Sequence, residues 1–256
     1  RGEVAHVARR VNAAIQDAYK AGFLGKGIFG SNYDLELTLH IGAGAYICGE
    51  ESALIESLEG KPGIPRIRPP FPVTHGYLGR PTVVNNVETF IAAAQITLHG
   101  ADWFKAAGTS ASSGSKILSI SGDCEKPGIY EYPFGITIRQ ILDDCDATDV
   151  QAVQIGGPAG VLLSAEEFNR TIAFEDVSTG GSFLVFGKQC NLLAIHRNFA
   201  QFFAHESCGF CAPCRVGTQL LKNTLDNISA GRGSIGDLEE LRRLSQIVQH
   251  QSHCGL

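Results

Sequence analysis

Four cysteines have the spacing of ligands to an iron–sulfur cluster. Cys208, Cys211 and Cys214 are each separated by two residues, and Cys254 follows well downstream. A short run can bind three corners of a 4Fe–4S cube and a remote cysteine the fourth. Structural zinc more often uses two separated Cys-x2-Cys pairs, and a third interpretation, buried free cysteines, suits a loop with Gly and Pro poorly. The spacing favours the cluster.

A second candidate site follows from a glycine-rich turn. Apolar and polar residues alternate over 35–41, which predicts a strand, and the turn at 42–51 leads into a predicted helix at 52–59. Strand, glycine turn and helix form the usual setting of a phosphate or nucleotide site. The dinucleotide fingerprint is incomplete, because Ile47 occupies the place of its third glycine.

Two adjacent acids, Glu50 and Glu51, stand at the start of that helix. They would repel a pyrophosphate, but they suit ribose hydroxyls, an amide or the edge of a flavin. Taken alone, such a pair is more often a partner of the helix dipole than a ligand contact. Both interpretations stay open at this point.

A proline-rich segment at 61–72 is expected to be stiff and extended. It is either a linker or a support for Phe71, whose ring would be a rigid stacking platform. Asn85 and Asn86 are either ordinary turn residues or amides presented to a ligand.

The rest of the chain predicts the elements that position these groups. A helix is expected at 3–20 and another at 90–99, and the Gly- and Ser-rich run at 108–115 marks a domain boundary. Beyond it, strands with one crossing helix suggest a compact, structural β-grasp module. The last two helices must form a hairpin to bring Cys254 back to the cysteine loop. The predicted strands are 116–121, 128–132, 152–155, 160–163 and 183–186, and the helices are 137–143, 191–206, 216–228 and 237–250.

Composition narrows the class of protein. The 256 residues are 44% hydrophobic with a formal net charge of −5, which gives no basic surface for nucleic acid. No apolar run is long enough to span a bilayer, so direct membrane insertion is not expected. Because a cluster needs reduced thiolates, we expect a cytoplasmic location. Both ends look cut, since the first residue is not Met, so we expect a fragment of a longer polypeptide.

Five segments together resemble the NADH-oxidising flavoprotein subunit shared by respiratory complex I, NAD-reducing hydrogenases and NAD-dependent formate dehydrogenases. The segments are Gly42–Glu51, Leu58–Gly63, Pro69–Pro72, Val84–Thr89 and Glu206–Arg215. The resemblance implies an α/β plus α fold with three parts. These are a Rossmann-like FMN and NADH domain (1–107, its N-terminal part missing), a ubiquitin-like β-grasp domain (108–190) and a helical 4Fe–4S domain (191–256).

The resemblance also assigns site residues. Glu51 and Phe71 look like nicotinamide-nucleotide contacts, and Cys208, Cys211, Cys214 and Cys254 match the 4Fe–4S ligands. No catalytic side chain is assigned. The residues that look like FMN contacts are Tyr46, Gly49, Glu50, Val84, Asn85, Asn86 and Thr89.

The implied function is hydride transfer between NAD(H) and FMN, with single electrons passing to or from the 4Fe–4S cluster. The run Ser119–Gly135 looks closest to the diaphorase subunit of an NAD-reducing nickel–iron hydrogenase. The equivalent subunit of formate dehydrogenase or complex I is the alternative, and a non-catalytic iron–sulfur or zinc module is an alternative of another class.

Expected partners are other electron-transfer subunits of the same complex. They include a 2Fe–2S thioredoxin-like subunit or domain, a ferredoxin-like iron–sulfur subunit, and hydrogenase or formate dehydrogenase subunits. The family's other glycine-rich loop, which wraps the FMN phosphate, would lie upstream of this sequence. We therefore expect only part of the flavin site here.

Overall fold

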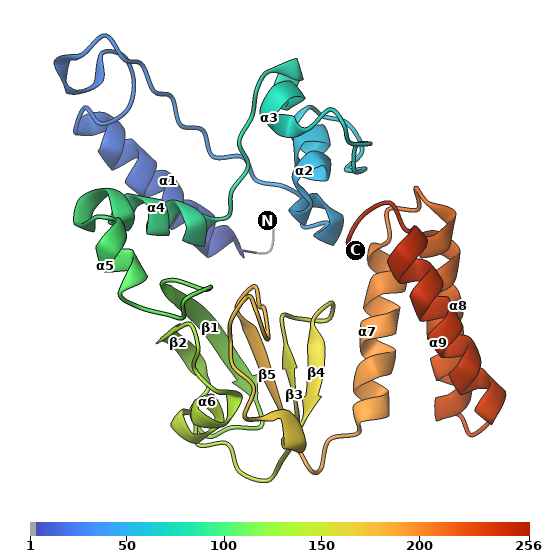
Figure 1. The fold of residues 1–256 in the computed structure, drawn as a ribbon. Helices are drawn as coiled ribbons and strands as arrows, with labels where there is room; N and C mark the ends of the chain where they lie inside the picture. Colours follow the sequence, from blue (N-terminus) through green and yellow to red (C-terminus); the bar gives the residue numbers. More distant parts are fainter. Residues whose placement is uncertain (1–3) are drawn as a thin grey trace. The chain divides into compact units, whose positions relative to one another are not determined.

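The computed structural model describes residues 4–256 (Figure 1), and by its internal contacts the chain divides into two compact units. One unit combines Arg1–Val84 with Ala200–Leu256, and the other is the continuous segment Asn85–Phe199. These units do not follow the three predicted domain bounds, which stay a prediction. Among the described residues, no helix has both the length and the apolar character needed to cross a membrane.

The second unit contains a five-stranded mixed sheet in the order β2-β1-β5-β3-β4. The first strand along the chain pairs antiparallel with the second strand and parallel with the fifth. The first and the last strand are therefore neighbours at the centre of the sheet. The strands are β1 (Ser115–Gly122), β2 (Gly128–Pro133), β3 (Val150–Ile155), β4 (Val161–Ser164) and β5 (Ser182–Gly187). All five predicted strands are therefore confirmed, with bounds shifted by one to two residues.

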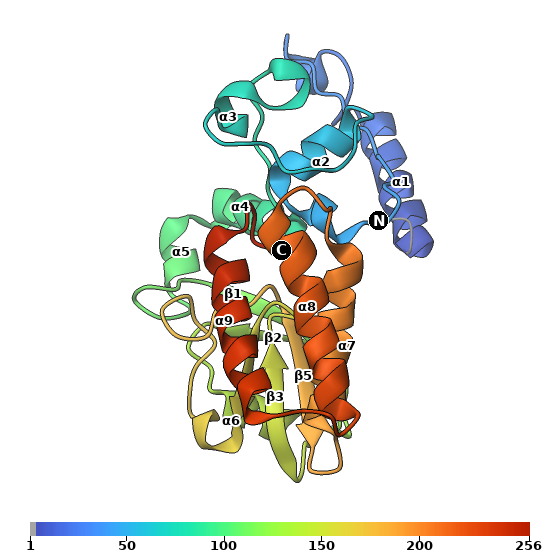
Figure 2. The same ribbon diagram turned by 90° about the vertical axis from the view of Figure 1, so that its right-hand side faces the viewer.

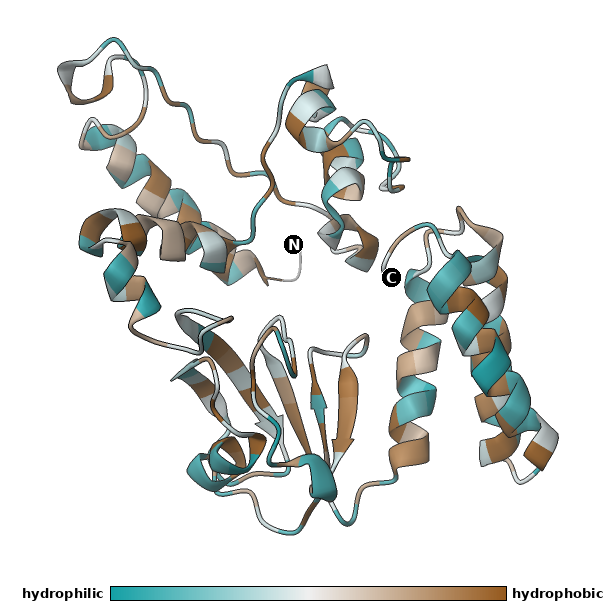
Figure 3. Ribbon diagram, viewed as in Figure 1, coloured by the Kyte–Doolittle hydropathy of each residue, from teal (hydrophilic) through white to brown (hydrophobic). Residues whose placement is uncertain are grey.

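One face of the sheet is buried against α6 (Ile138–Asp144), the predicted crossing helix. Every second residue of β1 is buried, including Leu118, as expected for a strand with one face on a core. The strands are coloured mainly towards the hydrophobic end of the scale (Figure 3). The core joins Leu118, Ile120, Ile138, Ile141, Val153, Ile155, Phe183 and Val185.

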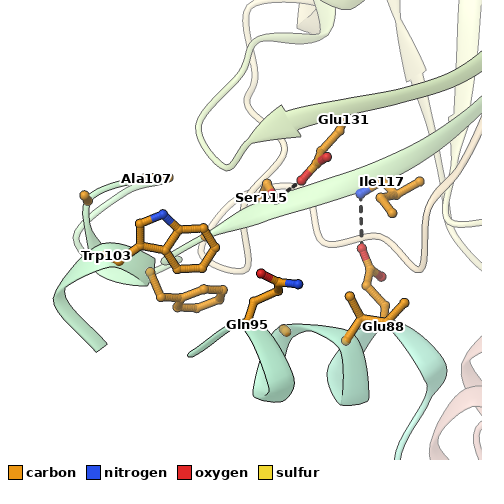
Figure 4. A pocket seen from close by; sticks show the side chains of 12 residues that line it. Glu88, Gln95, Trp103, Ala107, Ser115, Ile117 and Glu131 are labelled. Atoms are coloured by element: carbon orange, nitrogen blue, oxygen red, sulfur yellow. Dashed lines mark hydrogen bonds between the residues drawn. The ribbon is translucent and has the colours of Figure 1, made fainter. Parts of the chain in front are cut away.

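The second unit also contains α4 (Val87–His99) and α5 (Ala101–Lys105), a short helix that the sequence pattern did not predict. These helices and the β1–β2 pair line a cavity of about 410 Å³ (Figure 4). Glu88 accepts a hydrogen bond from the Ile117 N–H at 3.1 Å and pairs with Lys116. The ion pair and the hydrogen bond of Glu88 thus connect α4 to β1.

The first unit is mainly helical. In the described part the first predicted helix runs as α1 (Ala5–Lys20), and its expected first residue lies outside the described residues. A single helical turn, η3 (Tyr46–Gly49), leads directly into α2 (Glu51–Leu58). The other elements are η2 (Ile28–Gly30), α3 (Pro72–His75), η4 (Tyr77–Gly79), α8 (Ala212–Ser229) and α9 (Ile235–Gln251), together with the end of α7 (Leu192–Glu206).

The predicted hairpin of the last two helices is present, with α8 and α9 side by side (Figures 1 and 2). They approach closely at Gly217, where an added Cβ would lie 2.3 Å from the Val248 side chain. Glycine at this position lets the helices pack tightly, which returns the end of α9 to the level of the cysteine loop.

The strand predicted at 35–41 is not formed. The segment is extended, but its only strand-like pairing among the described residues is the single bridge between Gly25 and Leu35. A strand needs a neighbour to satisfy its backbone groups, and here the Leu37 N–H instead donates to the Tyr19 hydroxyl at 3.0 Å. Without a neighbouring strand, Leu37 and Ile41 are about half exposed, at 50% and 56%.

Candidate functional site

The cysteine loop connects the end of α7 to the start of α8. Gly209 has a φ of +76°, which turns the chain, and its carbonyl accepts a hydrogen bond of 2.5 Å from the Arg215 guanidinium. Cys211 is the N-cap residue of α8 and Cys214 lies in its first turn. The positive end of the helix dipole therefore lies beside two of the thiols, where it favours their thiolate forms.

Cys254 returns to this loop after α9. In addition to burial, negative charge on Cys208, Cys214 or Cys211 raises the pKa of the Cys254 thiol, which requires the sulfurs to be near one another. The structure therefore brings the four predicted ligands together. In the same segment, the ring of His253 contacts that of Phe210, with centroids 5.3 Å apart.

The loop environment shifts the thiol pKa values in different directions. Burial opposes ionisation of Cys211, but nearby polar groups, first the backbone of His253 and then that of Cys214, favour its thiolate, and the net pKa is lowered. Burial, followed by repulsion from neighbouring thiolates, raises the pKa of Cys254. Burial is also the main reason for the raised pKa of Cys214, although the Ser207 hydroxyl, 3.3 Å from its sulfur, opposes the shift.

This donor set fits a 4Fe–4S cube. The four cysteines are free thiols, close enough to affect one another's pKa. Four thiolates with this spacing along the chain match the ligands of a 4Fe–4S cube.

The Ser252 hydroxyl supports the same fit. It is buried without a hydrogen-bond partner at normal distance among the described groups. It nevertheless lies near enough to the Cys211 sulfur to contribute to the lowered pKa of that thiol. A buried hydroxyl without a hydrogen-bond partner is a group that a bound cluster would satisfy.

The glycine turn is joined directly to the cysteine loop. The Tyr46 N–H donates to the Glu206 carboxylate at 3.0 Å, although these residues are 160 positions apart. The Tyr46 ring contacts Phe202 edge-on, with centroids 5.1 Å apart. Since Glu206 lies two residues before Cys208, the predicted flavin turn and the cluster loop share one support. A cavity of about 330 Å³ lies between them.

The two acids after the turn have different surroundings. Glu50 is the N-cap of α2, and one of its oxygens accepts from the N–H groups of Ser52 and Ala53 at 3.0 and 2.9 Å. Glu51 caps no helix in the described chain and pairs with Arg68 at 2.9 Å, and the same guanidinium nitrogen lies 3.9 Å from Glu50. Capping fixes Glu50 in place, while its roles and those of Glu51 as cofactor contacts stay predictions.

The proline-rich segment is anchored through Arg66. Its N–H donates to the Ser52 hydroxyl at 2.8 Å, and its guanidinium pairs with Glu56 and with Glu59 at 3.0 Å. Hydrogen bonds from Lys61, then from the Leu78 N–H, lower the pKa of Glu59 to about 2, so this support stays ionised. Phe71 follows the anchored segment with its ring 52% exposed, which leaves it open for stacking.

The remaining predicted flavin residues are divided between the two units. Gly49 has open space around its Cα, where an added Cβ would meet nothing within 4 Å, so its backbone is accessible. Asn86 caps α4 by accepting from the Thr89 N–H at 2.8 Å. Val84 ends the first unit and Asn85 begins the second. That these residues form one flavin site therefore stays a prediction.

Comparison with known families decides the identity of both regions. Residues 1–95 match the Nuo51 FMN-binding domain, and residues 194–256 match the iron–sulfur binding region of NADH-ubiquinone oxidoreductase-F. The chain belongs to the NADH-oxidising FMN/4Fe–4S flavoprotein family. FMN and the 4Fe–4S cluster are the cofactors of these two regions.

Individual relatives and a solved structure support the same family. The chain is 46% identical to the HoxS subunit alpha of an NAD-reducing hydrogenase from Cupriavidus necator, and 43% identical to the F subunit of NADH-quinone oxidoreductase from Mycobacterium tuberculosis. Both matches cover 100% of the chain, but only 43% and 60% of the relatives. A crystal structure of an NAD+-reducing NiFe hydrogenase in the H2-reduced state matches with a TM-score of 0.85 and 51% identity, covering 87% of this chain and 39% of that one.

Sequence reasoning missed several residues of this flavoprotein site. Glu206 and Arg66 support the glycine turn and the proline-rich segment through contacts to distant positions. The contact of His253 with the Arg66 carbonyl likewise joins residues far apart in the sequence. Arg68 is the charged partner of Glu51 and lies in the proline-rich segment. No sequence pattern pairs these two residues.

Proposed function

We propose that this chain is the cofactor-bearing part of the diaphorase subunit of an NAD-reducing nickel–iron hydrogenase. The shared support of the two sites carries this proposal, because Glu206 bonds the Tyr46 turn and directly precedes the cysteine loop. The 51% identity to the hydrogenase structure favours that complex. The equivalent subunit of complex I is the second candidate, since the NADH-quinone oxidoreductase relative is also 43% identical over the whole chain.

Each proposed residue has a role that its surroundings support. Cys208, Cys211, Cys214 and Cys254 would hold the cluster, and the open ring of Phe71 would stack on the nicotinamide nucleotide. Glu51 would bind that nucleotide next to Arg68. The FMN would lie against Tyr46, Gly49, Glu50, Val84, Asn85, Asn86 and Thr89.

When bound, FMN exchanges a hydride with NAD(H) and single electrons with the cluster. The protein's own part is to hold the rings in contact and the thiolates near the flavin turn. The partners proposed for the electrons are the other iron–sulfur and hydrogenase subunits of the complex.

The proposal is tested by adding NADH under anaerobic conditions to the whole complex that contains this chain. We expect the flavin absorbance to bleach and an electron paramagnetic resonance (EPR) signal of a reduced 4Fe–4S cluster to appear with it. Dithionite supplies the control, because it reduces a cluster without any nucleotide site. A cluster signal with dithionite but no bleaching with NADH would reject the diaphorase function and retain an electron-transfer module.

Replacing Glu51 by glutamine is expected to weaken NADH binding more than flavin binding. A hydrogen bond to a charged partner contributes about 1.5–3 kcal/mol, so KM for NADH should rise about ten-fold or more. Steady-state kinetics and the flavin content of the purified complex measure the two effects. The matched control is Glu239→Gln, an exposed acid on α9. If Glu51→Gln leaves KM unchanged, the acid serves only Arg68 and the helix dipole.

A further inference from the structure

A lysine occupies a core position of the sheet. Alternate residues of β1 are buried, and Lys116 is the first of them, followed by Leu118. Lys116 is only 9% exposed, although a lysine is almost never buried unless it is paired. An uncompensated charge at such a position would be strongly destabilising, so Lys116 needs an acid from another element.

Glu88 of α4 is that acid, and both of its carboxylate oxygens are used. Oε2 pairs with the Lys116 ammonium, and Oε1 accepts a hydrogen bond from the Ile117 N–H at 3.1 Å (Figure 4). The pairing of β1 with β5 begins only at Ser119, so the Ile117 N–H lies beyond the end of that ladder. Glu88 thus supplies both a backbone acceptor and a counter-charge to the start of β1.

The same turn of α4 carries three of the predicted flavin contacts. These residues, Asn85, Asn86 and Thr89, are exposed. Glu88 lies among them, but its side chain is only 33% exposed. Asn86 caps α4 through its side-chain oxygen, so its amide nitrogen is the atom that it can offer to a ligand. The helix dipole favours an acid in this turn, but it does not direct both oxygens of that acid to one strand.

We propose that Lys116 is a positioning residue for FMN, which holds the first turn of α4 in its binding orientation through the Glu88 carboxylate. This inference rests on the proposed function, since it requires FMN to contact Asn85, Asn86 and Thr89. Strand β1 then takes part in flavin binding through α4. Without the anchor, the turn spends only part of its time in the binding orientation, and the apparent affinity for FMN falls by that fraction.

Three substitutions separate the charge from the bulk of the side chain. Lys116→Met keeps an unbranched apolar chain in the core but cannot pair with Glu88. Lys116→Arg keeps the positive charge and should restore most of the binding. Glu88→Gln keeps an oxygen for the Ile117 N–H but loses the counter-charge. Lys188→Met is the matched control, because Lys188 pairs with Asp149 in the same unit and both side chains are exposed.

The measurement is the dissociation constant for FMN, obtained by titrating flavin back into the whole complex after its removal and following the quenching of flavin fluorescence. We expect Lys116→Met and Glu88→Gln each to raise this constant about ten-fold, as for a turn that is in the binding orientation about one tenth of the time. Because Lys116 acts through Glu88, the double variant should bind no more weakly than the weaker single variant. Lys188→Met should leave the constant unchanged.

Two further readouts distinguish positioning from a general loss of structure. KM for NADH at saturating FMN should stay unchanged, because the proposed nucleotide contacts Glu51 and Phe71 belong to the other unit. The EPR signal of the dithionite-reduced cluster should also persist, since the four cysteines belong to that unit as well. If Lys116→Met loses the cluster signal, Glu88→Gln decides the inference, and loss of the cluster in both variants overturns it.

The outcomes that contradict the role of Lys116 are specific. An unmoved dissociation constant in Lys116→Met overturns the inference, as does an equal loss of affinity in Lys116→Arg or an additive loss in the double variant. A wild-type complex that binds no FMN would overturn the proposed function together with this inference. Wild-type binding with unmoved variants overturns only the inference.

Discussion

Replacing Cys211 by serine is expected to abolish electron transfer to partner subunits while NADH still reduces the flavin. Serine offers a hard, poorly ionised hydroxyl at the N-cap of α8, in place of the thiol whose pKa is lowered there. The cluster should therefore be lost or badly bound. The proposed flavin and nucleotide contacts lie around Tyr46 to Thr89, on other elements, and should remain.

Stopped-flow mixing of the Cys211→Ser complex with NADH should bleach the flavin at a near-normal rate. Turnover linked to the partner subunits should fall to background, because the flavin has lost its one-electron outlet. Circular dichroism shows whether α8 and α9 stay folded. The matched control is Cys190→Ser, which keeps a donor to the Asp123 carboxylate, 3.0 Å from the Cys190 sulfur. Persistent partner-linked turnover in a folded mutant without its cluster would refute the conduit role of these cysteines.

The second large effect concerns stability, and we expect it from Phe183→Ala. Phe183 lies on the central strand β5, is 0% exposed and belongs to the core between the sheet and α6. Removing a buried phenylalanine side chain costs about 3–5 kcal/mol, because apolar burial is lost and a cavity remains. Denaturant unfolding of the whole chain, followed by circular dichroism, measures the loss.

Phe174→Ala is the matched control in the same unit. Phe174 is 69% exposed, and its ring contact is to Phe134 at a centroid distance of 5.1 Å. Such a pair contributes about 0.5–1.5 kcal/mol, so this variant should lose no more than that. Equal losses in the two variants would show that the sheet core does not limit the stability of the chain.

Local patterns predicted the second unit well. β1 and β2 have alternating burial and the short helix α6 has an apolar face, and these signals depend on neighbours along the chain. The stretch at 35–41 has the same alternation as β1 but does not form a strand. The difference lies in pairing, since β1 has two neighbouring strands and the earlier stretch has none in the described chain. Alternation alone does not report pairing.

The candidate site was predictable in part for a similar reason. Cysteine spacing and paired acids are visible along the sequence. The bond from Tyr46 to Glu206 and that from His253 to Arg66 join residues far apart, so no local pattern encodes them. Glu50 shows a further limit of prediction from sequence. A carboxylate at the start of a helix can cap the helix or bind a ligand, and the sequence is the same in both cases.

The discontinuity of the first unit has a consequence for the order of events during synthesis. The segment up to Val84 leaves the ribosome before the sheet, but its partners from Ala200 onwards follow the sheet. The intervening sheet pairs β1 with β5, so it can close once Gly187 has emerged. Domains generally fold as they are completed. The Tyr46 N–H can therefore bond Glu206 only after the sheet has been made, and the proposed set of cluster ligands is complete only after Cys254 has been translated.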